Sequence, residues 1–191
     1  MEKRRDLSIA EASFSKMIFT ETPLHGAFII DLEPREDDRG FFARTFCVNE
    51  FAKHGLNSNV VQCNLSSNLK AGTLRGMHFQ ETPASEAKLI RCVRGAVHDV
   101  VVDLRRESAT YRQAYAVELT MENRRALYIP ESFGHGFQTL RDDTEVEYQM
   151  SEFHAPQHAR GFRYDDAAFS IQWPRPVSII SAQDLKWPPF S

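Results

Sequence analysis

Short segments rich in β-branched and aromatic residues recur along most of this chain, and they constrain its fold more than any other feature. Such segments favour β-strands, because these side chains pack well on a pleated surface. Turn-forming residues separate them at a spacing of roughly ten residues, which is typical of an antiparallel sandwich or barrel. The sequence therefore predicts an all-β fold, specifically a jelly roll. The predicted strands are 26–33, 88–95, 96–105, 113–120, 125–130, 144–150 and 169–174.

Helical signals are confined to two stretches. Residues 47–55, CVNEFAKHG, have helical spacing and end at Gly55, and residues 1–15 form the second candidate. A chain of 191 residues is long enough to bury a sizeable core, and it contains no evident internal repeat. We therefore expect one domain with short flanking helices.

The composition excludes several classes of protein. A net charge of −3 leaves no basic field that would favour nucleic acid as a partner. Cys47, Cys63 and Cys92 are far apart and form no C-x-x-C pair, which predicts reduced core thiols in a cytoplasmic protein. No apolar run is long enough to span a membrane, and charged residues interrupt the N-terminal region where a signal peptide would need one.

Three ionisable residues occupy strand positions that alternation would turn inward. His78 shares a face with Leu74, Gly76 and Gln80 in LRGMHFQ, and Lys88 shares one with Ile90 and Cys92. Tyr148 likewise groups with Val146 and Met150. A histidine, a tyrosine and a lysine that face one barrel interior are suited to acid–base chemistry on a small molecule held there.

Each of these residues also has a purely structural interpretation. An inward histidine is more often a hydrogen-bonded core residue, and a buried tyrosine usually packs as an aromatic. Lys88 could extend its ammonium to solvent from a strand end. Arg39, before Gly40, could be a turn residue, and Asp184 could be a surface turn or helix cap. The order of the motifs along the chain carries more information than any one residue.

That order resembles the nucleotide-sugar 3,5-epimerases typified by dTDP-4-dehydrorhamnose 3,5-epimerase. The resemblance covers about residues 22–189, and Lys88 follows His78 by ten positions while Tyr148 follows His135 by thirteen, as in the family. The motifs that carry it are DDRGFFARTF, TLRGMHFQ, KLIRCVRGAVHDVVVDLR, ENRRALYIPESFGHGFQTL, VEYQM, YDDAAFSIQWP and SAQDLKWPP. The resemblance implies a cupin-like jelly roll, or double-stranded β-helix, over 22–191, with 1–21 as a tail or arm. It also implies a homodimer in which N-terminal strands pair across subunits.

The resemblance further implies a reaction and the residues that perform it. A 4-keto group acidifies the hydrogens at C3 and C5 of a sugar, so a proton can be removed and returned through an enolate. His78 would be the base, paired with Asp184, and Tyr148 would be the acid on the opposite face. Lys88 would stabilise the developing enolate. No cofactor is needed for this chemistry.

The same resemblance implies a set of substrate-binding residues. Arginine suits a diphosphate because its planar guanidinium can make two parallel hydrogen bonds. Strict alternation puts Arg75 and His78 on opposite faces, so both can serve the ligand only if the strand bends or bulges near Gly76. The implied binding residues are Arg39, Phe42, Gln62, Arg75, His135 and His154.

Two departures from the family pattern leave the exact substrate open. His154 stands where the rhamnose-pathway enzymes usually have a tyrosine, and Arg44 stands where many have glutamate. The sugar, and whether C3, C5 or both are inverted, therefore stay undetermined at this point.

Three other functions compete with epimerisation. A metal-dependent cupin needs two histidines one residue apart, yet no H-x-H occurs in the chain, so we expect no metal. A keto-isomerase that shifts the carbonyl from C4 to C3 is the nearest enzymatic alternative. A non-catalytic sugar-nucleotide-binding jelly roll is the third, and the presence of His78, Asp184 and Tyr148 argues against it.

Overall fold

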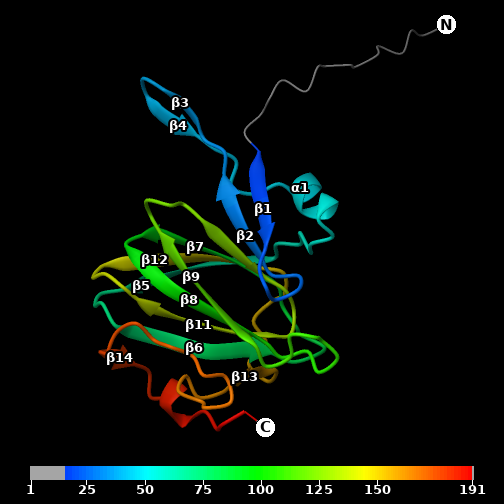
Figure 1. Cartoon of the computed structure of the whole chain (residues 1–191), viewed down its shortest axis with the longest axis vertical. Helices are drawn as coiled ribbons and strands as arrows, with labels where there is room; N and C mark the ends of the chain where they lie inside the picture. The colour runs from blue at the N-terminus through cyan, green and yellow to red at the C-terminus, as the bar shows by residue number, and fades with distance from the viewer. Residues whose placement is uncertain (1–15, 191) are drawn as a thin grey trace, which may run out of the picture.

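Two antiparallel sheets packed face to face form the body of the protein, as the computed structural model shows (Figure 1); it describes residues 16–190. The first sheet has the strand order β1 (Met17–Glu21), β2 (Phe28–Leu32), β10 (Ala126–Ile129), β7 (Lys88–Arg94), β12 (Thr144–Met150), β5 (Gln62–Asn68). The second has the order β13 (Ala159–Gly161), β6 (Thr73–Gln80), β11 (Phe133–Thr139), β8 (Ala96–Asp103), β9 (Ala114–Thr120). A further strand, β14 (Ile179–Ile180), pairs in parallel with β6.

Three smaller elements complete the fold. The strands β3 (Arg35–Asp37) and β4 (Gly40–Phe42) form a hairpin that projects away from the two sheets (Figure 1). The helix α1 (Val48–Lys53) and the single turn of 3-10 helix η1 (Asp184–Lys186) lie on opposite sides of the body. Within residues 16–190, no helix is both long and apolar enough to cross a membrane.

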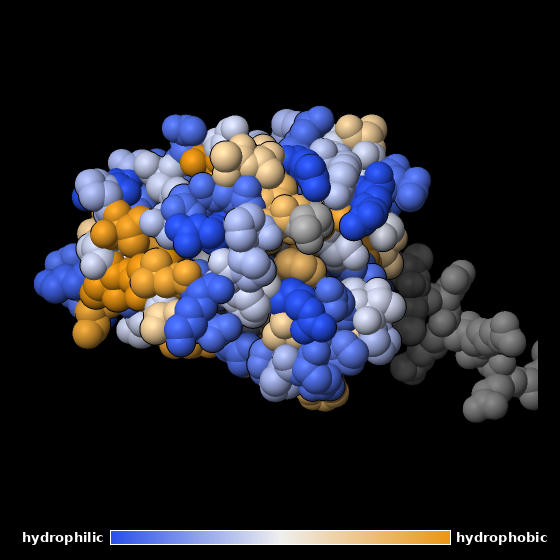
Figure 2. Space-filling view, turned by 90° about the horizontal axis from the view of Figure 1, so that it is seen from below, coloured by the Kyte–Doolittle hydropathy of each residue, from blue (hydrophilic) through white to orange (hydrophobic). Residues whose placement is uncertain are grey.

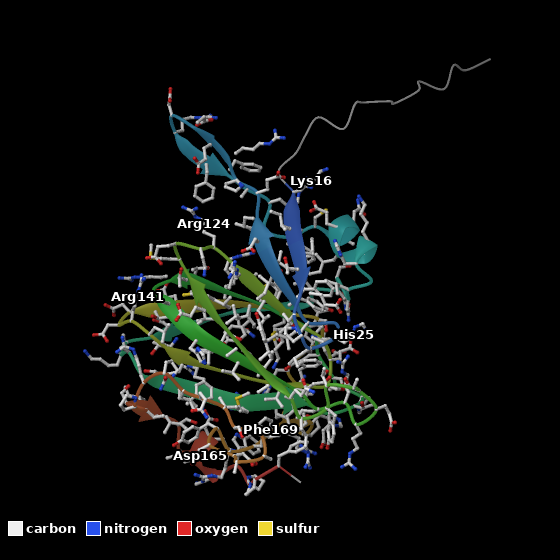
Figure 3. The ribbon with its side chains drawn as sticks, viewed as in Figure 1. Lys16, His25, Arg124, Arg141, Asp165 and Phe169 are labelled. Carbon is white, nitrogen blue, oxygen red and sulfur yellow. The ribbon has the colours of Figure 1, made fainter. Side chains whose placement is uncertain are left out.

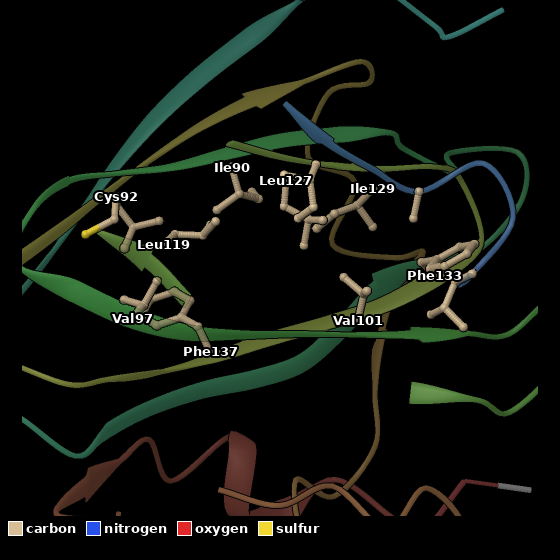
Figure 4. Close-up of a cluster of buried hydrophobic side chains, with 13 residues drawn as sticks. Ile90, Cys92, Val97, Val101, Leu119, Leu127, Ile129, Phe133 and Phe137 are labelled. Atoms are coloured by element: carbon tan, nitrogen blue, oxygen red, sulfur yellow. The ribbon is translucent and has the colours of Figure 1, made fainter. Parts of the chain in front are cut away.

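The main hydrophobic core fills the space between the two sheets (Figure 4). Ile90 and Leu127 extend into it from the first sheet, and Val97, Val101 and Phe137 extend into it from the second. These side chains are all 1% exposed or less, so the sheets enclose a continuous apolar interior. This arrangement confirms the predicted all-β, cupin-like jelly roll.

Each sheet also has a cover on its outer face. Phe51 of α1 packs against Tyr128 and Phe19 on the first sheet. The C-terminal segment covers the second sheet, where Phe162 and Phe169 form one buried cluster with Met77. Figure 3 labels Phe169 and Asp165 in this segment. The face seen from the side of this segment still carries hydrophobic side chains among hydrophilic ones (Figure 2).

Most elements predicted from the sequence are present. Six of the seven predicted strands correspond to β2, β7, β8, β9, β10 and β12. The predicted helix at 47–55 is α1, and it ends before Gly55, whose φ of +69° suits a residue that follows a helix. The helix considered for residues 1–15 lies outside the described residues. The last residues of the expected N-terminal arm form β1, which pairs with β2 of the same chain.

The strand predicted at 169–174 is wrong. Phe169, Ile171 and Trp173 do share one buried side, which is why the segment alternates, but they pack on the outer face of the second sheet as irregular chain. Ser170 has a φ of +50°, which an extended strand cannot accommodate. The Trp173 indole donates to the Tyr164 carbonyl at 2.9 Å, so the segment is fixed by side-chain contacts.

The strands β5 and β11 were not predicted, because their compositions are unusual for strands. β5 reads QCNLSSN and is largely polar, while β11 reads FGHGFQT and contains two glycines. A side chain at Gly134 would collide with the ring of Phe162 at 2.6 Å, so close packing explains the glycine.

The expectation of three core thiols was wrong. All three cysteines are free, but only Cys92 is buried, and Cys63 is exposed.

The strand β6 leaves its regular register in the middle, as the sequence required. His78 is opposite His135 on β11, but Arg75 is opposite Phe137, so β6 has one more residue than β11 over this stretch. Gly76 lies in the bulge with a φ of +133°, and a Cβ there would be 2.6 Å from the Cα of Gly136. The bulge therefore requires glycine both for its dihedral angle and for its packing.

Replacing Gly76 should destabilise the protein strongly. For Gly76→Ala we expect the free energy of unfolding to fall by about 3 kcal/mol, because a strained φ and a backbone collision add together. Chemical denaturation monitored by circular dichroism measures this change. Gly55→Ala is the matched control, since Gly55 also has a positive φ but nothing lies within 4 Å of a Cβ there. The control should lose only about 1 kcal/mol, and equal losses in both variants would contradict the packing argument.

Candidate active site

The pair formed by His78 and Asp184 brings together residues 106 positions apart in the chain. The Nε2 atom of His78 is 2.6 Å from Oδ1 of Asp184. The carboxylate can only accept this hydrogen bond, so the neutral imidazole carries its proton on Nε2 and leaves the lone pair of Nδ1 available as a base. The side chain of His78 is 44% exposed while that of Asp184 is 5% exposed, so a ligand can reach the ring but not its partner.

The bulge in β6 and the C-terminal segment hold Asp184 in place. The backbone amide of Gly76 donates to Oδ2 of Asp184 at 3.4 Å, and the Asp184 amide donates to the Ser181 hydroxyl at 3.0 Å. Burial by itself raises the pKa of Asp184, but the hydrogen bond from His78 and those from Gly76 and Ser181 outweigh it and hold the pKa below its usual value. Asp184 is thus an ionised, buried partner and not a surface cap.

Tyr148 lies on β12 with its ring against the core between the sheets. Its ring centroid is 6.2 Å from that of His135, which is opposite His78 in the β6–β11 register. Residues directly opposite in an antiparallel pair share a face, so His78 and Tyr148 line the same interior. Burial, and secondarily the negative charge of Asp99, raise the pKa of Tyr148 well above its usual value. The phenol therefore keeps its proton at neutral pH, as a general acid must.

Lys88 is the buried cation of this interior. It shares the inner face of β7 with Ile90 and Cys92, and only 6% of it is exposed. Its Nζ is 3.0 Å from Oε1 of Glu86, which is also buried. In the register of β7 and β12, Tyr148 is opposite Ile90, so Lys88 and Tyr148 occupy neighbouring diagonal positions. Lys88 therefore does not extend to solvent.

His135 has a carboxylate partner that the sequence analysis did not name. The Nε2 of His135 is 3.0 Å from both carboxylate oxygens of Asp99, and both side chains are at most 5% exposed. Asp99 lies on β8 in an inward row with Val97 and Val101. A charged residue in an otherwise apolar, inward-facing row is the pattern that identified Lys88, and the same pattern would have identified Asp99.

The predicted anion-binding and ligand-lining residues divide into two groups. Arg75 extends from the bulged strand and donates from Nε to Oδ1 of Asn68 at 2.8 Å. Gln62 accepts the backbone amide of His154 at 3.1 Å, so these two predicted residues meet at one end of β5. The structure thus places Arg75 on the same strand as His78, and Gln62 and His154 beside β12, the strand of Tyr148.

Arg39 and Phe42 lie away from the other predicted site residues in the structure. Both belong to the β3–β4 hairpin, which stands clear of the sheets (Figure 1). The side chain of Arg39 is 89% exposed and pairs with Asp37, and Phe42 is 70% exposed. Within one chain, neither residue joins His78.

Several polar residues that lie beside these side chains were not predicted from the sequence. Gln80, buried on β6, donates to Glu86 at 3.0 Å and accepts the Ala155 amide at 2.7 Å, which links Lys88 to the loop that carries His154. On β5, Asn68 accepts a hydrogen bond from Arg75, and Ser66 is a diagonal neighbour of Tyr148 on the same face. The alternating polar residues at 62, 64, 66 and 68 were the available signal, since they define one face of a strand. Across residues 16–190, no three potential metal ligands gather into a group.

Comparison with known proteins identifies the family. A family model described as dTDP-4-dehydrorhamnose 3,5-epimerase matches residues 21–191. The chain is 43% identical over 176 residues to dTDP-4-dehydrorhamnose 3,5-epimerase from Methanothermobacter thermautotrophicus, an alignment that covers 90% of this chain and 94% of that protein. This chain belongs to the dTDP-4-dehydrorhamnose 3,5-epimerase family.

Solved structures of this family agree with the fold. The dTDP-4-dehydrorhamnose 3,5-epimerase of Elizabethkingia anophelis superposes with a TM-score of 0.88 at 36% identity, covering 91% of this chain and 96% of its own. A 3′-monoepimerase from Streptomyces bikiniensis, in complex with dTDP-quinovose, superposes with a TM-score of 0.80 at 31% identity, covering 88% and 85% of the two chains. Proteins with this fold are thus described both as 3,5-epimerases, which act on two carbons, and as a 3′-monoepimerase, which acts on one.

The ionisation of Asp184 offers a direct test of the site geometry. We expect its carboxyl to titrate below the ordinary value of 3.8 in the folded protein, and His78→Gln to raise the midpoint because the hydrogen bond from the imidazole is lost. Carbon-13 NMR of the labelled carboxyl groups over a pH series measures both midpoints. His154→Gln is the control and should leave the Asp184 midpoint unchanged. A midpoint that is the same in His78→Gln and wild type would show that His78 does not stabilise the carboxylate.

The same shift predicts how stability depends on pH. Because the folded-state pKa of Asp184 lies below the unfolded value, its hydrogen bonds contribute stability above about pH 4. That contribution is lost as the pH falls through the folded-state pKa.

Proposed function

We propose that this protein is an epimerase that inverts C5, C3 or both in a nucleotide-linked 4-keto-6-deoxyhexose. The substrate would be dTDP-4-dehydro-6-deoxyglucose or a related NDP-4-keto sugar, in deoxysugar biosynthesis. The observation that carries the proposal is the imidazole of His78, held by Asp184 at 2.6 Å, on the same interior surface as the protonated phenol of Tyr148. Membership of the 3,5-epimerase family supports the reaction class.

The chemistry follows from the protonation states of these groups. Nδ1 of His78 takes the proton next to the ketone, and the electron pair of the broken C–H bond moves into an enolate. The imidazolium that forms is stabilised by Asp184. Tyr148 then gives its proton to the carbon from the other face of the ring, which restores the ketone and leaves a phenolate. Proton exchange with water returns both side chains to their starting states, so no redox cofactor or metal is required.

The charge that develops on the ketone oxygen needs a positive partner in a poorly hydrated interior. Lys88 is the cation of the interior that could serve, and a buried charge acts more strongly there than in water. Arg75, Gln62, His135 and His154 would hold the nucleotide-linked sugar. Because similar proteins act on one or on two centres, the number of centres inverted is a question for experiment.

The proposal predicts a specific pattern of isotope exchange. Incubation of dTDP-4-dehydro-6-deoxyglucose with the wild-type protein in D₂O should introduce deuterium at each inverted carbon, as seen by proton NMR. His78→Ala should slow exchange by about 10³-fold, the contribution of a positioned base. Tyr148→Phe should slow inversion by at least about 10²-fold while His78 still exchanges the acidic hydrogen.

The controls separate the competing functions. A substrate-only sample in D₂O gives the background exchange, and Glu122→Gln, a variant of an exposed residue that pairs with Arg141, checks for nonspecific effects. Exchange at background level with wild-type protein would contradict the proposal. A product whose carbonyl has moved from C4 to C3 would identify a keto-isomerase instead.

We also propose that the functional unit is a cytoplasmic homodimer built from the single domain at 22–191 and an N-terminal segment, 1–21, whose strand β1 pairs with β2 of its own chain and would contact the partner along its other edge. The projecting β3–β4 hairpin supports this, since it exposes 46% of Phe41 and 70% of Phe42, and apolar rings are costly to leave in water. β1 lies at the edge of the first sheet, where a strand of a second subunit could pair. Three cysteines without a disulfide fit a reducing compartment. In this dimer, Arg39 and Phe42 would act in the partner's site.

Subunit complementation tests the shared site. His78→Ala and the double variant Arg39→Ala/Phe42→Ala should each be nearly inactive alone. When the two are co-expressed, random pairing should restore about one quarter of wild-type activity, because half of the dimers contain one complete site. The D₂O exchange assay and light scattering measure activity and mass.

A second mixture serves as the control for complementation. His78→Ala and Tyr148→Phe alter residues of the same barrel, so their mixture should show no recovery. If the first mixture also stays inactive, or the protein elutes as a monomer, the hairpin does not act across subunits.

A further inference from the structure

The inner face of β5 carries a row of polar side chains beside Tyr148 that the proposed reaction has not used. Asn68 is 3% exposed, and Ser66 is partly buried. In the β5–β12 register Ser66 is opposite Val146, so it is a diagonal neighbour of Tyr148 on the same face. This row connects Tyr148 to Arg75.

Chemistry at both ends fixes the orientation of the Asn68 amide. Its Oδ1 accepts the Arg75 Nε hydrogen at 2.8 Å, and a guanidinium can only donate. Its Nδ2 donates to the Thr144 carbonyl at 3.2 Å, and a carbonyl can only accept. The amide therefore cannot be reversed without losing both hydrogen bonds, which leaves the second Nδ2 hydrogen for Ser66.

That hydrogen in turn sets the direction of the Ser66 hydroxyl. Nδ2 of Asn68 lies 3.2 Å from Oγ of Ser66, so the serine oxygen accepts from the amide. The serine's own hydrogen is then free to point toward Tyr148, its diagonal neighbour on the same face, and a hydroxyl that donates to the phenol oxygen lowers the pKa of Tyr148. A phenol whose oxygen accepts from Ser66 keeps its own hydrogen for the interior of the barrel.

We infer that Ser66, oriented by Asn68, is a positioning residue for the proton donor Tyr148. The inference rests on the proposed epimerase function, in which Tyr148 delivers a proton to carbon. As that O–H bond breaks and the C–H bond forms, negative charge moves onto the phenol oxygen, where the Ser66 hydroxyl donates and the nearby charge of Arg75 attracts. Ser66 does not touch the base His78, so it acts on protonation and not on deprotonation.

The ratio of inversion to exchange tests this inference. In D₂O, base-catalysed removal of the hydrogen can end in return from the same face, which gives deuterium without inversion, or in delivery by Tyr148, which gives inversion. With dTDP-4-dehydro-6-deoxyglucose as probe, Ser66→Ala should lower the ratio of inverted to uninverted deuterated sugar by about tenfold. Asn68→Asp, which keeps an oxygen for Arg75 but removes both N–H donors, should lower it in the same direction.

Matched variants keep the test decisive. Ser66→Thr keeps a hydroxyl and should restore the ratio to near the wild-type value. Ser67→Ala removes a hydroxyl from the next residue, which is exposed on the other face of β5, and should leave the ratio unchanged.

The possible failures can be told apart. A wild-type ratio in Ser66→Ala, or equal losses of exchange and inversion, would overturn the positioning role and leave the epimerase function intact. Absence of exchange in the wild-type protein would instead overturn the proposed function itself.

Discussion

The bulge at Gly76 is the constraint on which the site depends. It shifts β6 by one residue against β11, so that Arg75 and His78 are not separated by strict alternation. The Gly76 amide also donates to Asp184, which ties the C-terminal segment to the strand that carries His78. Gly136 on β11 allows the two backbones to approach, because a Cβ at either position would meet the other strand. One local departure from the pleat thus links the second sheet, its outer cover and the acid–base pair.

The interior also shows how an apolar barrel can hold several charges. Three ionisable pairs line or border this interior: His78 with Asp184, His135 with Asp99, and Lys88 with Glu86. Pairing removes most of the penalty of burial, although such pairs add little net stability compared with apolar residues. Each pair instead contributes geometry, because the partner holds the side chain in one orientation through a hydrogen bond to a defined atom. An enolate that forms among preorganised groups requires little reorganisation of its surroundings.

Local sequence patterns predicted the fold better than they predicted the site. Alternation identified the inner faces of β7 and β12, and with them Lys88 and Tyr148, because one strand suffices to define a face. The contact between His78 and Asp184 spans 106 positions, and no local pattern encodes a contact of that range; the family resemblance supplied it. The prediction of a strand at 169–174 failed for a different reason, since there the local pattern was present. Its alternation reports burial against Met77 and Phe162 correctly, but a pattern of burial does not specify hydrogen-bonded pairing.

The two departures from the family pattern differ in what they can change. Arg44 is paired with Glu50 of α1, and Glu50 also accepts the Met17 amide at 2.9 Å, so this substitution is built into the junction of β1 and α1. His154 follows Phe153, which is 61% exposed, in a loop held by Gln62 and Gln80. The backbone of that loop is fixed by these two amides whatever side chain stands at 154, so an imidazole in place of a phenol changes the chemistry of the loop without requiring a new backbone path. The side chain at position 154 can therefore vary while the placement of His78, Lys88 and Tyr148 on β6, β7 and β12 stays the same.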